Sequence, residues 1–316
     1  MVFPSIRRAG TDSAAPRNLS VSVAASGRRA SGGRSGDLLR RLFRRPGARS
    51  GLVILLVAVS SAVFAPWLAP FDPEQGELLQ RLNPPGFVGD AFHPLGTDQL
   101  GRDVLSRLIY GSRISLLIGS VSVVLGGLVG LSLGLIAGYF GRRIDNIIMR
   151  VADIQMAFPY VLLALAMVAL LKPSVVNLVL VFTVTEWFVY ARVVRVATLS
   201  LRQREFIVAA IALGQPHRKI LLRHILPNVI SPLTVIASFE MAKIISTEAA
   251  LSFLGLGIPP PTPSWGGMLA DGREYLQDAW WVAVFAGTAL MLTVLAINFL
   301  GDAARDALDP RMERLG

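Results

Sequence analysis

The chain has 316 residues, of which 53% are apolar and only 16% are charged, whereas an ordinary soluble protein carries about 25% charged residues. This hydrophobicity excludes a largely disordered chain, and the absence of cysteine excludes a disulfide scaffold. The charge is lopsided, because 31 Lys and Arg face 21 Asp and Glu and leave a net charge of +10. Such a chain is typical of an integral membrane protein with basic loops on one side. Nucleic-acid binding is the alternative, and the positions of the charges must decide between the two.

The N-terminal segment is strongly basic. Residues 1–50 contain eleven Arg and two acidic residues, with the highest density of Arg at 40–45. Because 1–36 is rich in Ser, Gly, Ala and Arg, we interpret 1–48 as a disordered basic leader. A cleaved signal peptide is the alternative, but its apolar core would be about 7–15 residues, shorter than the run that follows this leader.

Six stretches are long and apolar enough to cross a bilayer, which takes about 20 residues of helix. The sequence therefore predicts an all-α integral membrane protein, with six transmembrane helices within a single domain over 49–316. The spans lie approximately at 51–70, 114–139, 154–171, 175–196, 229–251 and 281–300.

The connections between these spans alternate in charge. The segment 192–224 has seven Lys and Arg and one acid, whereas 71–112 has three Arg and six acids, and 252–280 has one Arg and three acids. With six spans, the basic segments fall on one face of the membrane and the acidic ones on the other. The positive-inside rule then places both termini in the cytoplasm and the loops 71–112 and 252–280 outside. The charge is thus explained by orientation, and we expect no nucleic-acid partner.

The second span contains a glycine repeat at Gly126, Gly130, Gly134 and Gly138. A spacing of four residues places these glycines in one smooth stripe along a helix, where another backbone can approach closely. Tight helix packing is the favoured interpretation, and a sliding surface beside a pathway is the alternative.

Four of the charged residues inside the predicted spans are candidate site residues. Glu240 and Lys243 share one helical face and could neutralise each other, whereas Glu186 has no obvious local partner. Together with Glu248 they are candidates for a polar pathway or a subunit contact, because charges at membrane depth are costly. An ion pair near a helix end is an equally good explanation for Glu240 and Lys243.

Enzyme chemistry has little support in the sequence. There is no phosphate-binding G-x-x-x-x-G-K-[ST] loop, no H-E-x-x-H and no G-x-S-x-G, and His93, His217 and His224 lack a zinc-site spacing. We expect no catalytic residue, no metal and no cofactor bound by this chain. A membrane protein of this kind would be a passive pore, a gradient-driven carrier, or a pore driven by a partner.

The cytoplasmic loop at about 197–227 is the most informative connection. Its first part predicts a short helix over 205–214 that ends at Gly214, and its second part predicts a helix over 218–226 that ends at Pro227. A short helix with apolar residues on the cytoplasmic side suits a groove of another protein or the lipid interface.

Several motifs in this chain resemble those of a known family. Ala209-Ala210, Gly214 and His224-Ile225-Leu226-Pro227 resemble the "EAA" loop of bacterial ATP-binding-cassette (ABC) importer permeases. Five further segments are similar to the C-type permease subunit of dipeptide, oligopeptide and nickel importers: 93–107, Ala157-Phe158-Pro159, 248–255, Pro263-Ser264-Trp265-Gly266 and 301–311. The resemblance covers about 50–312 and departs at Val208, where the family has its namesake Glu. Glu205, three residues earlier, would keep a carboxylate on the same face.

The resemblance implies a type I importer permease in the bacterial inner membrane. It implies that the loop is a coupling helix that docks on an ATPase, through Glu205, Ala209, Ala210, Gly214, His224 and Pro227. It also implies four kinds of partner: a second homologous permease, two ATPase subunits that hold ATP and Mg, an extracytoplasmic solute-binding protein and the lipid bilayer. Di- or oligopeptides are the expected substrates. Nickel chelates, glutathione or another small solute are the alternatives, and a gradient-driven carrier is the alternative outside the family.

Overall fold

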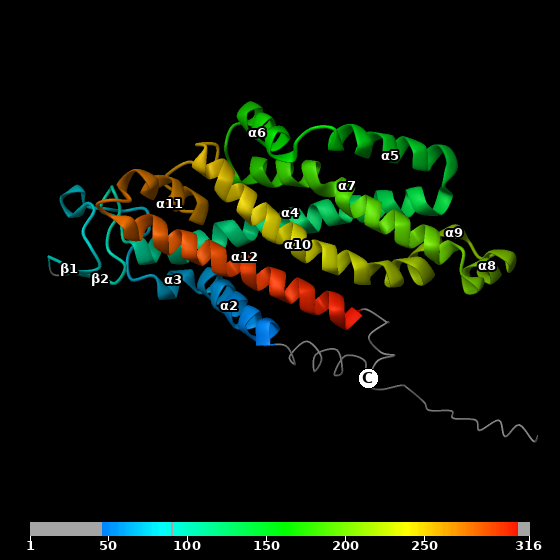
Figure 1. The fold of residues 1–316 in the computed structure, drawn as a ribbon, viewed down its shortest axis with the longest axis horizontal. Coiled ribbons are helices and arrows are strands. Elements are labelled where there is room, and N and C mark those ends of the chain that lie inside the picture. The colour runs from blue at the N-terminus through cyan, green and yellow to red at the C-terminus, as the bar shows by residue number, and fades with distance from the viewer. Residues whose placement is uncertain (1–45, 90, 309–316) are drawn as a thin grey trace, which may run out of the picture.

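The computed structural model describes residues 46–89 and 91–308. The leader predicted for 1–48 lies outside the described residues, apart from its last three residues, which belong to the first helix. Five long helices lie side by side along the long axis of the molecule (Figure 1). They are α2 (Pro46–Val63), α4 (Val104–Phe140), α7 (Val175–Arg202), α10 (Leu226–Phe253) and α12 (Trp280–Leu308).

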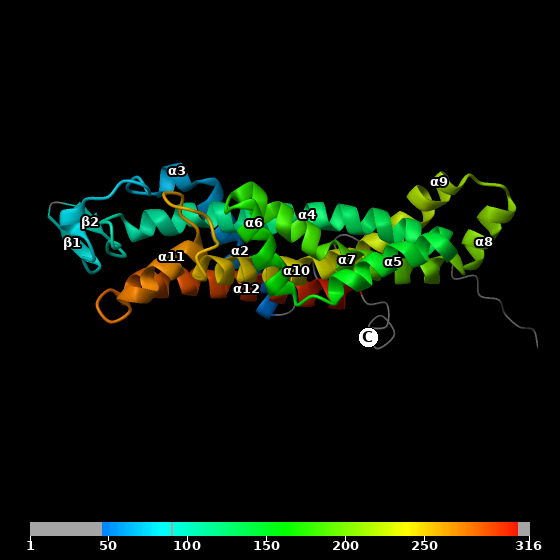
Figure 2. The ribbon, with the colours of Figure 1, turned by 90° about the horizontal axis from the view of Figure 1, so that it is seen from above.

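Shorter elements gather at the two ends of this bundle (Figures 1 and 2). One end, which we call the hairpin end, carries the antiparallel pair β1 (Gly86–Val88) and β2 (Ala91–His93), the helices α3 (Ala65–Leu68) and α11 (Trp265–Gly272), and the short turns η1 (Leu78–Gln80) and η3 (Arg273–Tyr275). The other end, which we call the α8 end, carries α8 (Glu205–Ala212), α9 (His217–Lys219) and the π-helical turn η2 (Ile220–Ile225). The start of α2 and the end of α12 both point toward the α8 end (Figure 1).

The longest helix, α4, has well-defined ends. Asp103 caps its start, because the side chain accepts a hydrogen bond from the backbone N–H of Ser106 (2.7 Å). At its other end Gly141 adopts a positive φ of 65°, which ends the helix. The 37 residues between these caps span about 55 Å at 1.5 Å per residue, so α4 is longer than a bilayer core of about 30 Å.

The glycine stripe lies against α7. A Cβ atom on Gly130 would be 2.3 Å from the backbone oxygen of Trp187, and one on Gly134 would be 2.6 Å from the oxygen of Ala191. Gly138 meets Thr198 and Arg195 in the same way, and Gly126 faces Tyr190 at a looser 3.6 Å. The stripe therefore brings the backbones of α4 and α7 together, as small residues do between membrane helices.

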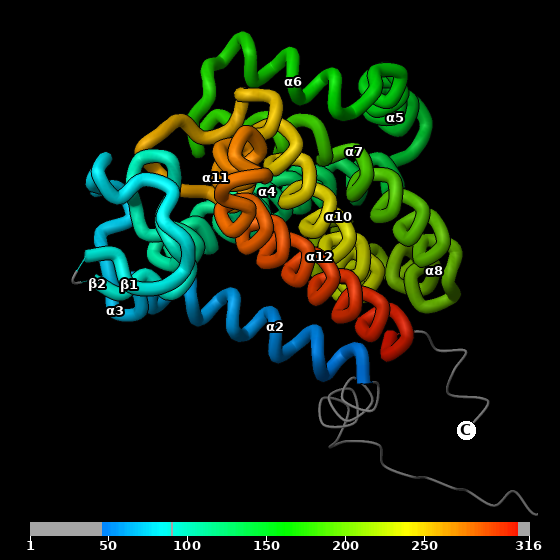
Figure 3. Tube along the Cα trace, turned by 60° about the vertical axis from the view of Figure 1, so that its left-hand side comes forward, coloured from blue at the N-terminus to red at the C-terminus, as the bar shows by residue number. Residues whose placement is uncertain are grey.

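The prediction of a single third span over 154–171 is wrong in detail. The chain forms α5 (Arg142–Met156) and α6 (Tyr160–Leu171), which meet at an angle of 87°. Pro159 caps α6 with a ψ of 124°, so the helical backbone cannot continue through it. Within the described residues, five helices are long and apolar enough to cross a bilayer, and a sixth span is added if the bent pair counts as one. In the turned view of Figure 3, α5 and α6 lie on the side of the bundle opposite to α2.

The short helix predicted over 218–226 does not end at Pro227. The chain passes through η2 directly into α10, and Pro227 lies in the first turn of α10. Proline is tolerated there because its missing N–H has no partner within the first turn of an α-helix. Pro232 lies further inside the same helix. The rod from His217 to Phe253 thus reaches from the α8 end to the hairpin end.

The bundle has an apolar core and an apolar outer surface. Ile118 of α4, Phe182 of α7 and Ile244 of α10 are fully buried together. Large apolar side chains such as Val57 and Leu128 are exposed on the outside. An apolar outer surface of this kind is suited to contact with lipid and with other membrane subunits.

Candidate functional site

Three of the four predicted intramembrane charges meet in one cluster. Lys243 of α10 donates hydrogen bonds to Glu186 Oε2 of α7 (3.0 Å) and to Glu240 Oε2 of α10 (3.1 Å). The Lys243 ammonium also lies over the ring of Tyr160, 4.4 Å from its centroid. Glu186 is fully buried, whereas the Lys243 side chain is 39% exposed. Glu186, which lacks a partner near it in the sequence, is therefore paired through tertiary contact.

The break between α5 and α6 lies beside this cluster. Gln155, near the end of α5, donates to the backbone oxygen of Val184 (2.5 Å) and accepts from Trp187 Nε1 (2.9 Å). These two residues flank Glu186 on α7, and Tyr160 begins α6 on the other side of the break. The broken span is thus fixed against the charged part of α7 and α10.

Glu248 is separate from the cluster. Its Oε1 atom accepts hydrogen bonds from Ser252 Oγ (2.9 Å) and Ser264 Oγ (3.2 Å). Ser264 also caps α11, so the buried carboxylate ties the end of α10 to the start of that helix. This geometry indicates that Glu248 organises the hairpin end.

The predicted docking helix is present as α8. Gly214 ends it with a φ of 72°, and the N–H groups of Gly214 and Gln215 donate to the oxygens of Ile211 (2.9 Å) and Ala210 (3.1 Å). This is a Schellman ending, which explains the glycine. Ala210 is buried with Ile207 against the bundle, so its side chain supports α8 from below. The outward face of α8 consists of exposed residues, namely Glu205, Val208, Ala209 and Ala212.

His224 lies beside the turn that follows α8, whereas Pro227 is exposed in the first turn of α10. His224 Nε2 is 3.2 Å from Gln215 Oε1, in the turn after α8, and Tyr139 Oη is 2.7 Å from His217 Nδ1. These contacts hold the end of α8 and the start of the long α9–α10 rod against α4. Of the predicted docking residues, four are exposed, whereas Ala210 is buried under α8 and His224 is half-buried beside Gln215. The exposed ones are Glu205, Ala209, Gly214 and Pro227.

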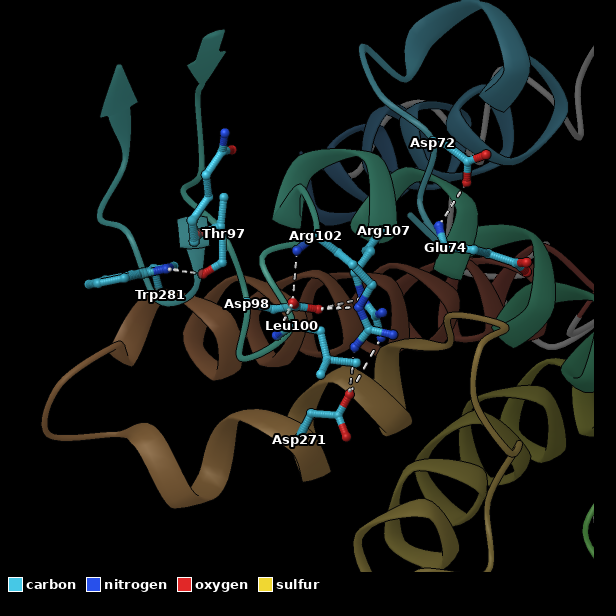
Figure 4. Close-up of polar contacts among 10 residues, drawn as sticks. Asp72, Glu74, Thr97, Asp98, Leu100, Arg102, Arg107, Asp271 and Trp281 are labelled. Atoms are coloured by element: carbon cyan, nitrogen blue, oxygen red, sulfur yellow. Dashed lines mark hydrogen bonds and ion pairs between the residues drawn. The ribbon is translucent and has the colours of Figure 1, made fainter. Parts of the chain in front are cut away.

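The hairpin end holds an ionic network that we did not predict as a site (Figure 4). Asp98 Oδ2 lies 2.7 Å from Arg102 Nε and 3.3 Å from Arg107 Nε, and all three side chains are buried. Asp271 of α11 reaches Arg107 Nη2 at 3.4 Å, and its side chain is 32% exposed. The network therefore joins the loop before α4 to α11.

Backbone contacts hold the same loop. Thr97 donates its hydroxyl to the oxygen of Gln80 (2.5 Å), and Trp281 Nε1 of α12 donates to the oxygen of Thr97 (3.1 Å). His93 Nδ1 pairs with Asp103 at 2.8 Å. The four-residue spacing of Asp98 and Arg102 could have indicated a local pair. Nothing in the sequence indicated Asp271, 164 residues beyond Arg107.

No group of three or more His, Cys, Asp or Glu side chains is arranged to hold a metal ion within 46–89 and 91–308. The charged side chains of these sites form ion pairs with one another.

Comparison with known proteins agrees with this architecture. Residues 130–314 match the family described as the binding-protein-dependent transport system inner membrane component, and residues 34–85 match the N-terminal transmembrane domain of oligopeptide transport permease C. The fold and the matched family define a multi-pass inner-membrane permease, and the chain belongs to the family of binding-protein-dependent transport system inner membrane components.

Its relatives are more specific. The chain is 45% identical over 84% of its length to the di/tripeptide transport system permease protein DppC of Pseudomonas aeruginosa, which it covers to 89%. It is 46% identical over 86% of its length to the dipeptide transport system permease protein DppC of Escherichia coli, which it covers to 91%. Among solved structures, the inward-facing MetNI methionine ABC transporter is similar, with a TM-score of 0.52 at 20% identity over 64% of this chain and 96% of that one. This likeness confirms the predicted all-α permease fold.

Proposed function

We propose that this chain is the permease subunit of an ABC importer that carries di- and oligopeptides across the bacterial inner membrane. The observation that carries the proposal is the match to dipeptide permeases at 45% and 46% identity over more than four fifths of the chain. The structure supports a transport role, because it combines apolar spans, a charged cluster within them and a short exposed helix at one end.

The two ends of the bundle differ in charge, which supports an assignment of one kind of partner to each end. The α8 end carries the basic segment 192–224 and faces the cytoplasm with both termini, whereas the hairpin end carries the acidic loops and faces outward. Two ATPase subunits, which hold ATP and Mg, serve this chain and a second homologous permease. A solute-binding protein delivers peptides to the hairpin end. This chain needs no cofactor of its own.

The contacts of α8 suggest how ATP drives transport. Ile207 and Ala210 pack in one cluster with Leu135 of α4, Val194 of α7 and Val229 of α10. A movement of α8 with its ATPase is therefore passed to three membrane helices at once. Two of them, α7 and α10, carry the charged cluster. ATP binding thus biases the bundle between two global states, as alternating access requires.

The outward face of α8 gives a direct test of docking. Replacing Ala209 with Trp adds bulk to an exposed position, and overpacking a contact costs about 1–3 kcal/mol. We expect the amount of ATPase that co-purifies with this chain to fall about tenfold, while thermal unfolding of the permease is unchanged. Leu222→Trp is the matched control, because Leu222 is 54% exposed on the neighbouring η2 turn. Equal loss of ATPase in both variants would contradict docking through α8.

Uptake by cells tests the function. A strain that lacks this chain should take up a radiolabelled dipeptide only at background level, and a plasmid copy should restore uptake. Labelled nickel and glutathione are measured in parallel, with a free amino acid as the control. If dipeptide uptake persists while uptake of nickel or glutathione is lost, the assigned substrate class is wrong.

A further inference from the structure

The Glu186–Glu240–Lys243 cluster contains two carboxylates for one ammonium group. One oxygen of each carboxylate contacts Lys243 Nζ, at 3.0 and 3.1 Å. The second oxygen of Glu186 is buried and has no hydrogen-bond partner among the described residues. A buried carboxylate oxygen without a donor is costly. The cluster therefore has the capacity for one more cationic donor.

The cluster lies at membrane depth and is open on one side. Lys243 is eight residues from the end of the span 229–251, or about 12 Å along the helix at 1.5 Å per residue. Its side chain is 39% exposed although the surrounding helix is apolar. An ammonium group that faces lipid at this depth is strongly disfavoured. This face of α10 therefore borders water or protein in the assembled transporter.

The broken span supplies a second, independent observation. Irregular backbone at membrane depth is tolerated where it lines a cavity or is covered by protein, and broken helices in transporters mark the sites where substrates bind. Here the 87° break between α5 and α6 lies beside the same charges. Gln155 holds one side of the break to α7, and Tyr160 presents its ring to Lys243 on the other side.

We propose that this cluster binds the α-ammonium group of the peptide as it passes through the membrane, an inference that rests on the proposed function. Glu240, the more exposed carboxylate, makes the first contact, and Glu186 supplies the negative charge behind it. The flexible side chain of Lys243 gives up one of its two carboxylate contacts, and the ammonium group of the peptide takes its place. The ring of Tyr160 offers a cation–π surface beside it. The peptide carboxylate is disfavoured there because two carboxylates already contact the one ammonium group of the cluster.

This assignment also fits the chemistry of the substrate. Every di- or oligopeptide has the same α-ammonium group, whereas the side chains differ. A site that recognises only the α-ammonium group binds peptides of many sequences and still rejects anions.

Direct binding to the whole transporter tests the proposal. The complex is purified through a tag on this chain with its partner subunits and placed in nanodiscs without nucleotide or solute-binding protein. Binding of tritiated dialanine is measured by scintillation proximity, with dialanine, N-acetyl-dialanine and dialanine amide as competitors. We expect acetylation of the N-terminus to weaken competition about tenfold or more, which is the scale of a lost charged contact.

The variants then locate this effect. Glu186→Gln and Glu240→Gln should each remove most of the tenfold penalty of acetylation, with the affinity for N-acetyl-dialanine unchanged. Glu248→Gln makes the same chemical change on the same helix outside the cluster and should keep the penalty. A purely structural role would lower the number of binding sites but leave the penalty intact. The comparison of competitors on the unmodified transporter needs no variant, so poor folding of a variant does not remove the test.

Three results would overturn the inference: equal competition by acetylated and free dialanine, a full penalty in both Gln variants, or no binding of dialanine to the complex. Each of these binding results is compatible with loss of dipeptide uptake in a strain that lacks this chain. Failure of the inference is therefore distinguishable from failure of the proposed function, which cellular uptake measures separately.

Discussion

Gly130→Ala should destabilise the bundle by about 3 kcal/mol, because the added methyl group meets backbone that cannot move aside. Its Cβ would lie 2.3 Å from the oxygen of Trp187 and 2.5 Å from Cβ of Tyr190. The helices α4 and α7 would have to separate, and the loss would extend along their shared length. We expect a lower midpoint of thermal unfolding in detergent and less protein in the membrane.

Gly127→Ala is the matched control for this change. It lies in the same helix, three residues away, and its Cβ would meet only one ring atom of Tyr190, at 4.0 Å. Alanine favours the helix over glycine by about 1 kcal/mol, so this variant should be neutral or slightly more stable. Equal stability of the two variants would show that α4 and α7 do not pack through the glycine stripe.

Asp98→Ala should cost about 3–5 kcal/mol, because it leaves two buried guanidinium groups with too little negative charge. Asp98 contacts Arg102 and Arg107 through one oxygen. Through its other oxygen it accepts from the backbone N–H groups of Leu100 (2.8 Å) and Arg102 (3.0 Å). We expect the loop 93–103 to become accessible to protease added from outside the membrane, together with a lower unfolding midpoint.

Asp271→Ala removes the other carboxylate from the same network and serves as its control. This side chain is partly exposed, and its contacts with Arg102 and Arg107 are longer, at 3.7 and 3.4 Å. Exposed ion pairs contribute about 0–1 kcal/mol, so the effect should be several-fold smaller in free energy than that of Asp98→Ala. If the two variants are equally unstable, the network is not centred on Asp98.

The sequence correctly predicts those features that depend on residues within a single helix. The length of an apolar run identifies a span, and a glycine every four residues identifies a packing stripe, because both depend on residues close in the chain. The short α8 helix and its glycine ending are local in the same sense. Each of these could be predicted before any tertiary contact was known.

The remaining features depend on contacts that no local pattern reveals. Hydropathy joined the end of α5 to α6, because apolar residues flank Pro159 on both sides and only the backbone geometry shows the 87° bend. A proline such as Pro227 predicts the end of a helix, but here the π-helical turn before it runs directly into α10. The pairing of Glu186 with Lys243, 57 residues later, likewise depends on how α7 and α10 pack.

The positions of the predicted docking residues illustrate the same limit. The family motif groups Ala209 with Ala210, yet one is exposed and the other is buried under α8. A motif identifies which residues belong together, and the helix phase decides which of them meets a partner.

The central claim is that peptide import through this chain is driven by ATP. The most direct test is uptake of labelled dialanine by proteoliposomes that contain the whole transporter, with the solute-binding protein on the side of the hairpin end and ATP on the side of the α8 end. We predict accumulation that requires both ATP and the binding protein and that continues when ionophores abolish all ion gradients. Accumulation without ATP that follows a proton or sodium gradient, and stops on addition of the ionophore, would contradict the account.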